Sequence, residues 1–403
     1  MKKTSGAWRY CDVISFGNNE DRRKFAQMEE SVQPDFPANI QYTSGTTGKP
    51  KGATLTHYNI MNNAYFVGLR GGYHERRTII CVPNPLYHCF GCVMGSLSAL
   101  VHSQTCVFPA PSFEPLAALE AIHEERCTAV YGTPTMYIDM LNHDEYSNFD
   151  LSSIRSGIVA GAPCPVTLCS RLVTELGMVD LQVCYGTTET SPVSFMSVRD
   201  DPPEERIRNV GHIMDHLEAV IVDREGRIVA RGQKGDLLIR GYSVMHGYWD
   251  SEDQTRAEIT KDRWYHTGDI GIMGERGTVS IVGRSKDMIV RGGENVYPIE
   301  IEQFLDRHPD IDDVQIIGVP DDRFGEAVCA WIRLKCGATV TEEDIRQYCK
   351  GKIAHYKIPK YIFFKDVKDF PMTVTGKIKK YEMREISMRE LQLTNIESHY
   401  SQG

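Results

Sequence analysis

A run of glycine, hydroxyl and lysine residues over Tyr42–Gly52 has the composition of a phosphate-binding loop. It reads Tyr-Thr-Ser-Gly-Thr-Thr-Gly-Lys-Pro-Lys-Gly. Its glycines allow the backbone to approach a ligand closely, and its hydroxyls together with Lys49 and Lys51 can bind phosphate oxygens. The P-loop of NTPases would need a second glycine five residues after Gly45, where this chain has Pro50. We interpret the run as a phosphate loop of another kind, with a flexible linker as the alternative.

A second local cluster, Cys89-Phe-Gly-Cys92 beside His88, has the spacing of a metal or redox motif. A structural zinc site needs four ligands, and no second pair follows at a suitable spacing. We therefore interpret Cys89 and Cys92 as two buried thiols. The 12 cysteines are scattered along the chain, as is typical of a protein in a reducing compartment.

The composition is that of a folded globular protein. Of the 403 residues, 41% are hydrophobic and 25% are charged, which excludes a disordered, collagenous or coiled-coil chain. The net charge of −9 argues against a broad nucleic-acid-binding face, so no nucleic-acid partner is expected. No apolar run approaches the ~20 residues of a membrane span, so no transmembrane segment is expected. Lys2, Lys3 and Arg9 form no secretory signal, and the acidic residues that follow weaken the case for an organelle presequence.

Short apolar runs alternate with helix-length amphipathic stretches between residues 38 and 200. This alternation predicts an α/β fold in which a layered parallel sheet is covered by helices. The predicted strands are Ile40–Thr43, Thr78–Val82, Thr105–Phe108, Thr128–Tyr131, Gly157–Ala160 and Gln182–Cys184. The predicted helices are Tyr58–Leu69, Phe90–Val101, Glu114–Glu125, Pro134–Leu141 and Pro165–Glu175.

The chain changes character after residue 208. Residues 209–283 are rich in glycine and short alternating runs, which predict a small β subdomain with strands at Glu218–Val222, Asp236–Arg240 and Val279–Val282. The polar junction Gly283–Asp287 is the predicted linker to a smaller α+β domain. That domain is expected to contain helices Ile299–Leu305 and Glu342–Lys350 and strands Val314–Val319, Ala327–Leu334 and Tyr361–Phe364. The polar residues that end the chain are expected to fray.

Five motifs occur in one order along the chain, and together they resemble the signatures of the adenylate-forming superfamily. The superfamily contains acyl-CoA synthetases, luciferases and the adenylation domains of peptide synthetases. The motifs are the phosphate loop Thr43–Gly52, Tyr185-Gly-Thr-Thr-Glu189, Trp264-Tyr-His-Thr-Gly-Asp269, Gly283-Arg-Ser-Lys-Asp287 continuing to Gly292–Pro298, and Pro371-Met-Thr-Val-Thr-Gly-Lys377. One such motif is weak evidence, whereas five in order are highly specific.

Within the superfamily the chain is most similar to the mitochondrial medium-chain acyl-CoA synthetases. The shared segments include Pro85–Cys89, Tyr131–Thr135, Gly247–Trp249 and Lys357–Tyr361. Members of the family carry a further subdomain before the phosphate loop, so the resemblance implies a shortened chain. The implied organisation is a remnant N-terminal segment (1–37), a truncated large domain (38–283), a small C-terminal lid domain joined by a hinge (284–386) and a tail (387–403).

The resemblance implies ATP, Mg²⁺ and CoA as ligands, and it assigns most of the site to ATP. The implied ATP-binding residues are Thr43, Ser44, Gly45, Thr46, Thr47, Gly48, Lys49, Pro50, Lys51, Gly161, Ala162, Pro163, Tyr185, Gly186, Thr187, Asp269, Arg284 and Lys377. Tyr185 is expected to stack on adenine, and Asp269 to accept the ribose hydroxyls. From the residues alone, a core aromatic is the lesser alternative for Tyr185, and Asp269 could equally be a turn residue.

The remaining roles concern catalysis and the second substrate. Lys377 and Thr188 are expected to contact the reacting groups, with Thr188 at the α-phosphate. Glu189 is expected to hold Mg²⁺, a cation that prefers carboxylate and phosphate oxygens. His88 is expected to have a catalytic role, although a lone histidine is more often structural. The hinge is expected at Lys286, and the CoA-proximal loop at Gly292 and Gly293.

The reaction implied is the ligation of a medium-chain fatty acid to CoA through an acyl-adenylate, which releases pyrophosphate and then AMP. Leu86-Tyr-His-Cys89 stands where amino-acid-activating relatives hold the substrate amine with an aspartate, so an uncharged acyl chain is favoured. Two alternatives stay open: a catalytically impaired fragment that binds a nucleotide or acyl group, and an adenylating enzyme with another acceptor, such as a carrier protein. The resemblance implies the mitochondrial matrix, with the cytoplasm as the alternative, and leaves the oligomeric state open.

Overall fold

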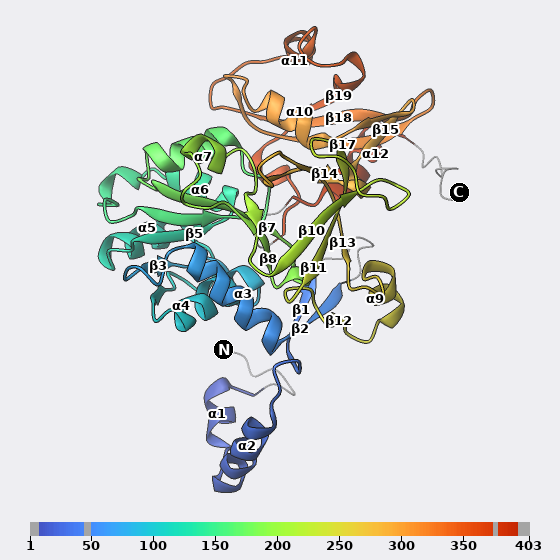
Figure 1. Cartoon of the computed structure of the whole chain (residues 1–403). Helices are drawn as coiled ribbons and strands as arrows, with labels where there is room; N and C mark the ends of the chain where they lie inside the picture. Colours follow the sequence, from blue (N-terminus) through green and yellow to red (C-terminus); the bar gives the residue numbers. More distant parts are fainter. Residues whose placement is uncertain (1–7, 44–49, 374–377, 394–403) are drawn as a thin grey trace.

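The computed structural model describes residues 8–43, 50–373 and 378–393. Figure 1 shows three parts: an N-terminal arm of two helices, a large body, and a smaller C-terminal domain at the far end from the arm. The α/β fold with a parallel sheet, a β-rich region and a second, smaller domain is confirmed. No helix in the described ranges is long and apolar enough to cross a membrane.

The large body is organised around a sheet with strand order β4-β3-β5-β6-β7-β8-β9. The pairs from β4 to β7 are parallel, while β8 and β9 add to one edge in antiparallel fashion. The strands are β3 (Ile79–Cys81), β4 (Thr105–Val107), β5 (Ala129–Gly132), β6 (Ser156–Val159), β7 (Asp180–Gly186), β8 (Val193–Met196) and β9 (His212–Ile213). The predicted strands between residues 78 and 184 therefore all exist.

Helices cover both faces of this sheet because its strands are apolar on both faces. In β5, Val130 packs on one side with α5 (Pro115–Glu124), α6 (Pro134–Leu141) and α7 (Val166–Thr174). Its neighbours Ala129 and Tyr131 pack on the other side against α3 (His57–Arg70) and the helix that follows β3. Continuous apolar strands of this kind are expected of a parallel sheet buried on two sides.

The predicted helix Phe90–Val101 is helical but not regular. Its first part is a π-helix, η1 (Phe90–Leu97), and α4 (Ser98–Val101) continues it. A π-type turn is wider than an α-turn and is often found near functional sites. The sequence pattern could not reveal it, because a segment of 8 residues is too short to distinguish the two helical periods.

Two smaller sheets complete the large body. One has the order β10-β11-β13-β14 and comprises β10 (Leu217–Val222), β11 (Lys234–Gly241), β13 (Tyr265–Met273) and β14 (Val279–Arg284). The other has the order β1-β2-β12 and comprises β1 (Pro37–Thr43), β2 (Lys51–Thr56) and β12 (Gly247–Tyr248). The short helices α8 (Pro203–Arg206) and α9 (Glu252–Glu258) lie in the connections.

These two sheets contain strands and pairings that were not predicted from the sequence. Strand β2 was not predicted, and it pairs antiparallel with β1 before α3 begins. The predicted β subdomain of 209–283 contains the sheet β10-β11-β13-β14 with its three predicted strands, while two further short strands of the range pair outside it: β12 joins β2 and β9 joins the large sheet. Strand β12 is stabilised by β2, a partner distant in sequence, which local alternation does not reveal.

The C-terminal domain has the sheet order β16-β15-β18-β17, with β19 parallel to β18. Its elements are β15 (Ile289–Arg291), β16 (Glu294–Val296), α10 (Pro298–Leu305), β17 (Ile311–Asp321), β18 (Gly325–Leu334), α11 (Glu342–Cys349), β19 (Tyr361–Phe364) and α12 (Lys380–Glu390). Helix α12 continues past the boundary expected at residue 386. Its Ser387 is buried and its hydroxyl accepts a hydrogen bond from Trp331 Nε1 at 2.8 Å, so this part of the predicted tail belongs to the domain.

The N-terminal arm consists of α1 (Tyr10–Ser15) and α2 (Asn19–Ser31). Figure 1 shows it projecting from the body beside the start of β1. Asn18 caps α2 by accepting hydrogen bonds from the backbone of Glu20 and Asp21. Every residue from Trp8 to Ala38 is exposed, so the arm contributes to none of the buried cores of the described residues.

Candidate active site

Asp269 lies at the centre of the best-defined polar cluster in the large body. It is only 4% exposed, and its carboxylate accepts a hydrogen bond from the Tyr185 hydroxyl, with an O–O distance of 2.6 Å. Arg284 Nε lies 3.3 Å from the other carboxylate oxygen. The Asp269 side chain comes from β13, Tyr185 from β7 and Arg284 from the end of β14. Three residues predicted from three separate motifs therefore meet at one point.

The geometry of the cluster keeps Tyr185 protonated and oriented. Burial and then the negative charge of Asp269 raise the pKa of the Tyr185 hydroxyl above its ordinary value. The hydroxyl therefore stays a donor, and its bond to Asp269 limits rotation of the ring. The ring lies 6.1 Å from that of Phe195 and is half-buried, which leaves part of it accessible.

Gly161 and Tyr185 both lie at the carboxyl ends of neighbouring parallel strands, β6 and β7. Gly161, Ala162 and Pro163 follow the carboxyl end of β6, and Tyr185 and Gly186 form the carboxyl end of β7, which runs parallel to β6. The carboxyl ends of parallel strands meet at one edge of a sheet, where α/β proteins bind ligands. Gly161 has φ +91° and all three residues of its turn are exposed.

Glu189 is a buried carboxylate without a cationic partner in the described ranges. It lies in the 3₁₀ turn η3 (Thr188–Thr190) and is 9% exposed. Its Oε1 accepts a hydrogen bond from the Tyr248 hydroxyl at 2.8 Å, and its backbone carbonyl accepts from the Met245 amide. No lysine or arginine that the structure describes forms an ion pair with it. A buried carboxylate in this state can bind a cation.

The turn that carries Glu189 is held by its own hydroxyls. Thr187 precedes η3, and its backbone N–H donates to Thr190 Oγ1 at 3.0 Å. That hydroxyl also donates to the carbonyl of Pro192. Thr188 is half-buried at the start of the turn, between Thr187 and Glu189.

Of the two lysines in the phosphate loop, the structure describes Lys51, which lies at the end of the loop. Its ammonium lies 3.4 Å from a carboxylate oxygen of Glu258 and 4.9 Å from the centre of the Tyr248 ring. Thr43, at the other end of the loop, pairs with Lys51 across the β1–β2 ladder. Pro50 is exposed just before β2. Both ends of the loop are therefore anchored on one sheet, close to the turn with Glu189.

His88 lies after the carboxyl end of β3, in the connection to η1. It is half-buried, and its Nδ1 accepts a hydrogen bond from the Phe90 amide at 3.2 Å. This contact helps to begin the helix, which is a structural role, and the catalytic role of His88 stays a prediction. Cys89 is buried and Cys92 half-buried, and burial raises the pKa of both thiols.

The residues assigned to the hinge and to CoA lie at the start of the C-terminal domain. Lys286 is exposed in the 3₁₀ turn η4 (Ser285–Asp287), which directly follows β14. Gly292 and Gly293 form the two-residue turn between β15 and β16, with φ +59° and +87°. Two positive φ values in succession are typical of a type I′ hairpin, which glycine adopts without strain.

Seven of the predicted site residues lie outside the described residues. They are Ser44, Gly45, Thr46, Thr47, Gly48 and Lys49 of the phosphate loop, and Lys377. Their assignment stays a prediction from the sequence.

Two residues in contact with the site were not predicted from the sequence. Tyr248 contacts Glu189, and Glu258 contacts Lys51. Tyr248 stands in a Gly-Tyr-Trp segment that the resemblance noted without a role. Glu258 ends α9 and carries no sequence signal that distinguishes it from other surface glutamates.

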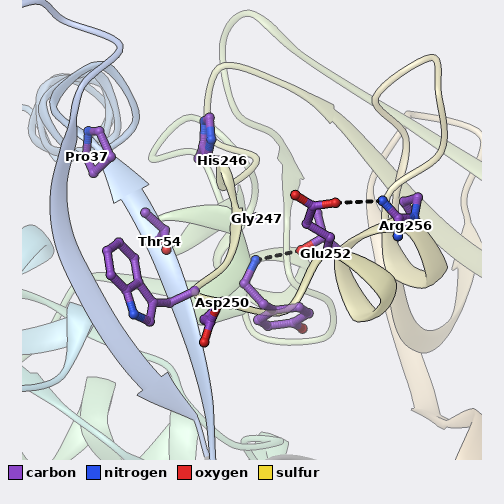
Figure 2. A pocket seen from close by; sticks show the side chains of 10 residues that line it. Pro37, Thr54, His246, Gly247, Asp250, Glu252 and Arg256 are labelled. Atoms are coloured by element: carbon purple, nitrogen blue, oxygen red, sulfur yellow. Dashed lines mark hydrogen bonds and ion pairs between the residues drawn. The ribbon is translucent and has the colours of Figure 1, made fainter.

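A hollow of about 390 Å³ opens on the outer side of the β1–β2–β12 sheet, between β12 and α9. Figure 2 shows Pro37, Thr54 and His246 around it, with Arg256 turned toward Glu252. These two charged side chains pair at 3.0 Å and so neutralise each other at the rim. Among the described residues that line the hollow, none was predicted to bind ATP, so we do not assign the substrate to it.

Two segments of the chain match known protein families. Residues 9–249 match the family of AMP-binding enzymes, and residues 300–377 match the AMP-binding enzyme C-terminal domain. The chain is 50% identical over 390 residues to the mitochondrial medium-chain acyl-CoA ligase ACSF2 of Danio rerio, and 49% identical to that of Homo sapiens. It is 42% identical to the putative acyl-CoA synthetase YngI of Bacillus subtilis, covering 98% of this chain and 71% of that protein.

The matches to ACSF2 cover 96% and 95% of this chain, which spans only 64% and 63% of the length of those two relatives. Solved structures agree with the sequence matches. ATP-bound MatB from Rhodopseudomonas palustris has a TM-score of 0.81 at 31% identity, covering 89% of this chain and 70% of that one. The o-succinylbenzoate CoA synthetase MenE of Bacillus subtilis, in complex with its acyl-adenylate intermediate, has a TM-score of 0.77 at 28% identity, covering 88% and 70%. Together with the converging motif residues, these matches place the chain in the family of AMP-binding enzymes.

Proposed function

We propose that this chain performs the chemistry of an AMP-forming acyl-CoA ligase on a medium-chain fatty acid. The observation that supports the proposal best is the meeting of Tyr185, Asp269 and Arg284, since three distant motifs build one polar cluster beside the carboxyl end of β7. The names of the relatives support the acid and the acceptor: medium-chain acyl-CoA ligase in ACSF2 and CoA synthetase in MenE. The mitochondrial location in the same names supports the matrix as the compartment.

The proposed reaction has two steps. In the first, an oxygen of the fatty-acid carboxylate attacks the α-phosphorus of ATP, and pyrophosphate leaves. In the second, the CoA thiolate attacks the acyl carbon, and AMP leaves as acyl-CoA forms. Neither step requires a covalent bond to the protein, so positioning and charge stabilisation provide the catalysis.

The residues predicted from the motifs divide this work. Asp269 accepts hydrogen bonds from the ribose hydroxyls, Tyr185 presents its ring to adenine, and Thr188 contacts the α-phosphate. Lys377 provides positive charge to the carboxylate and the α-phosphate in the first step. The small domain then turns at Lys286, which removes Lys377 and brings the Gly292–Gly293 turn to the CoA arm.

Glu189 fits the Mg²⁺ that such a reaction needs. The fit rests on its burial, on its lack of an ion pair with any described residue, and on the preference of this cation for carboxylate oxygens. When bound, Mg²⁺ would neutralise phosphate charge.

The experiment compares the two steps in the parent chain and in Lys377→Ala. ATP–pyrophosphate exchange measures the first step, and thioester formation from supplied acyl-AMP measures the second. We expect exchange to fall by about 10²–10³, as when one charged transition-state contact is lost, while the second step is retained. Lys379→Ala is the matched control, because its ammonium is 2.9 Å from Glu382 and is assigned no role in the reaction.

The same assays separate the alternatives. A parent chain with no pyrophosphate exchange on any acid from butyrate to palmitate would contradict the enzyme and favour a nucleotide-binding fragment. Transfer to a phosphopantetheinyl carrier protein but not to free CoA would contradict the acceptor. Equal loss of both steps in Lys377→Ala would remove that residue from its proposed role.

A further inference from the structure

The hydroxyl of Tyr248 makes the single side-chain hydrogen bond that the described residues provide to Glu189. It donates to Oε1 at 2.8 Å, and both side chains are buried. The hydroxyl is the donor in this contact, because a carboxylate oxygen can only accept. No described residue donates to the other carboxylate oxygen, Oε2, so the contact fixes one oxygen of the carboxylate and leaves the other without a described donor.

Tyr248 is itself held from three directions. Its backbone N–H donates to Thr255 Oγ1 at 2.9 Å, and its strand β12 pairs with β2 at Ala53. The ammonium of Lys51 lies 4.9 Å from the ring centre, a distance at which a cation attracts the face of an aromatic ring. Glu258 in turn holds Lys51 at 3.4 Å. The hydroxyl is therefore presented to Glu189 by a chain of contacts that begins on α9.

We propose that Tyr248 is a positioning residue that orients the Glu189 carboxylate toward the divalent cation of the bound nucleotide. The inference rests on the proposed function, because it assigns to Glu189 the metal of that reaction. A carboxylate held at one oxygen binds a cation with the other without losing rotational freedom at that moment. Such outer contacts to metal ligands typically change metal affinity by 10–100-fold.

The test measures metal binding directly, so that it does not depend on turnover. The probe is Mn²⁺, detected by its electron paramagnetic resonance signal, with α,β-methylene-ATP bound to the full chain. Tyr248→Phe removes the hydroxyl and keeps the ring that contacts Lys51. We expect the Mn²⁺ dissociation constant to rise about tenfold in this variant, while the affinity for the nucleotide in the presence of EDTA stays that of the parent.

Tyr137→Phe is the matched control for a merely structural effect. Tyr137 is also fully buried, and its hydroxyl donates to the backbone carbonyls of Val130 and Ile158, within the core of the large sheet. Its removal should lower thermal stability and leave the Mn²⁺ affinity unchanged. Equal weakening of Mn²⁺ binding in Tyr137→Phe and Tyr248→Phe would contradict the positioning role.

A double variant separates failure of this inference from failure of the proposed function. Glu189→Gln should weaken Mn²⁺ binding more than Tyr248→Phe, and combining the two should weaken it no further, because Tyr248 acts through Glu189. If Glu189→Gln weakens Mn²⁺ binding and Tyr248→Phe does not, the inference alone is wrong. If Glu189→Gln has no effect, or the parent chain binds no Mn²⁺ with the nucleotide, the metal site of the proposed function is wrong and the inference with it.

Discussion

Asp269 illustrates at the scale of one residue how a buried carboxylate organises a site. In sequence it follows a Thr-Gly pair and is also compatible with a turn. In the structure it lies within β13, where Thr267 Oγ1 accepts its backbone N–H and both carboxylate oxygens have partners. A solvated turn residue would not be 4% exposed. The turn interpretation is therefore wrong, while the ribose contact stays a prediction.

Asp269→Asn should weaken ATP binding about tenfold. The change keeps the shape of the side chain but removes the charge that Tyr185 and Arg284 contact. Hydrogen bonds to a charged group typically contribute about 1.5–3 kcal/mol, and a loss of 1.4 kcal/mol is tenfold in affinity. Isothermal titration with ATP measures the effect.

Asp201→Asn serves as the control for this prediction. Asp201 is also buried and contacts His212 and Arg276, with no predicted role in nucleotide binding. It should lower the free energy of unfolding without changing ATP affinity. If both substitutions weaken ATP binding equally, Asp269 has no specific contact with the nucleotide.

At the scale of elements, the connection from β7 to β8 depends on a close approach at Gly186. A Cβ added to Gly186 would lie 1.7 Å from the carbonyl oxygen of Pro192, which is backbone and cannot move away cheaply. The approach lets β7 end beside β8 and places the Glu189 turn between them. A glycine without a side chain is needed there.

Gly186→Ala should therefore lower the free energy of unfolding by about 3 kcal/mol, the upper part of the usual range for overpacking. Urea denaturation measures it. Gly271→Ala is the control, because an added Cβ there meets only ordinary contacts of 3.4 Å or more. If Gly186→Ala and Gly271→Ala unfold at similar urea concentrations, the steric argument is wrong.

The junction after β14 allows a specific test of the predicted hinge. Arg284 has φ −94° and ψ 138°, an extended conformation that a following proline tolerates. Ser285→Pro should therefore fit the observed arrangement and restrict rotation away from it. We expect one half-reaction to persist while the coupled reaction falls at least about tenfold, because both domain arrangements are needed in one cycle.

Ser285→Ala controls for the lost hydroxyl, which donates to Asp236 Oδ1 at 2.9 Å. It should leave the coupled rate near that of the parent. A proline variant whose coupled rate matches the parent would place the hinge elsewhere.

At the scale of the whole molecule, the outer face of the β1–β2–β12 sheet is apolar and open. Ile40, Tyr42 and Trp249 surround Gly52, within about 3.5 Å of where its Cβ would lie, and are 37%, 69% and 57% exposed. The nearby arm adds exposed aromatic residues such as Trp8 and Phe25. Exposed apolar surface of this kind favours association.

We therefore predict that the chain self-associates as its concentration rises, as measured by sedimentation velocity. Trp249→Ser should reduce association by removing the largest side chain of this face. Leu100→Ser, at a 71% exposed leucine on α4, should have a smaller effect. A chain that stays monomeric at all concentrations would contradict the prediction.

Residue types and local patterns were enough to propose which residues bind the nucleotide and to predict most of the local structure around them. The apolar strands between residues 78 and 184 were predictable because a strand buried on both faces needs a continuous apolar run. The motif residues Tyr185, Asp269 and Arg284 were predictable because their types and order are specific to one superfamily.

The tertiary structure alone decided which segments became partners. The sequence of β2 begins with Lys-Gly and is typical of a loop. In the structure the segment is a strand because it pairs with β1 on one side and β12 on the other. The β12 pairing takes Tyr248 out of the β-rich region in which it lies in sequence and places its hydroxyl on Glu189. Local periodicity predicts that a residue is buried, but it does not predict which residues it packs against. The contact between Glu189 and Tyr248, 59 positions apart, is therefore visible only in the folded chain.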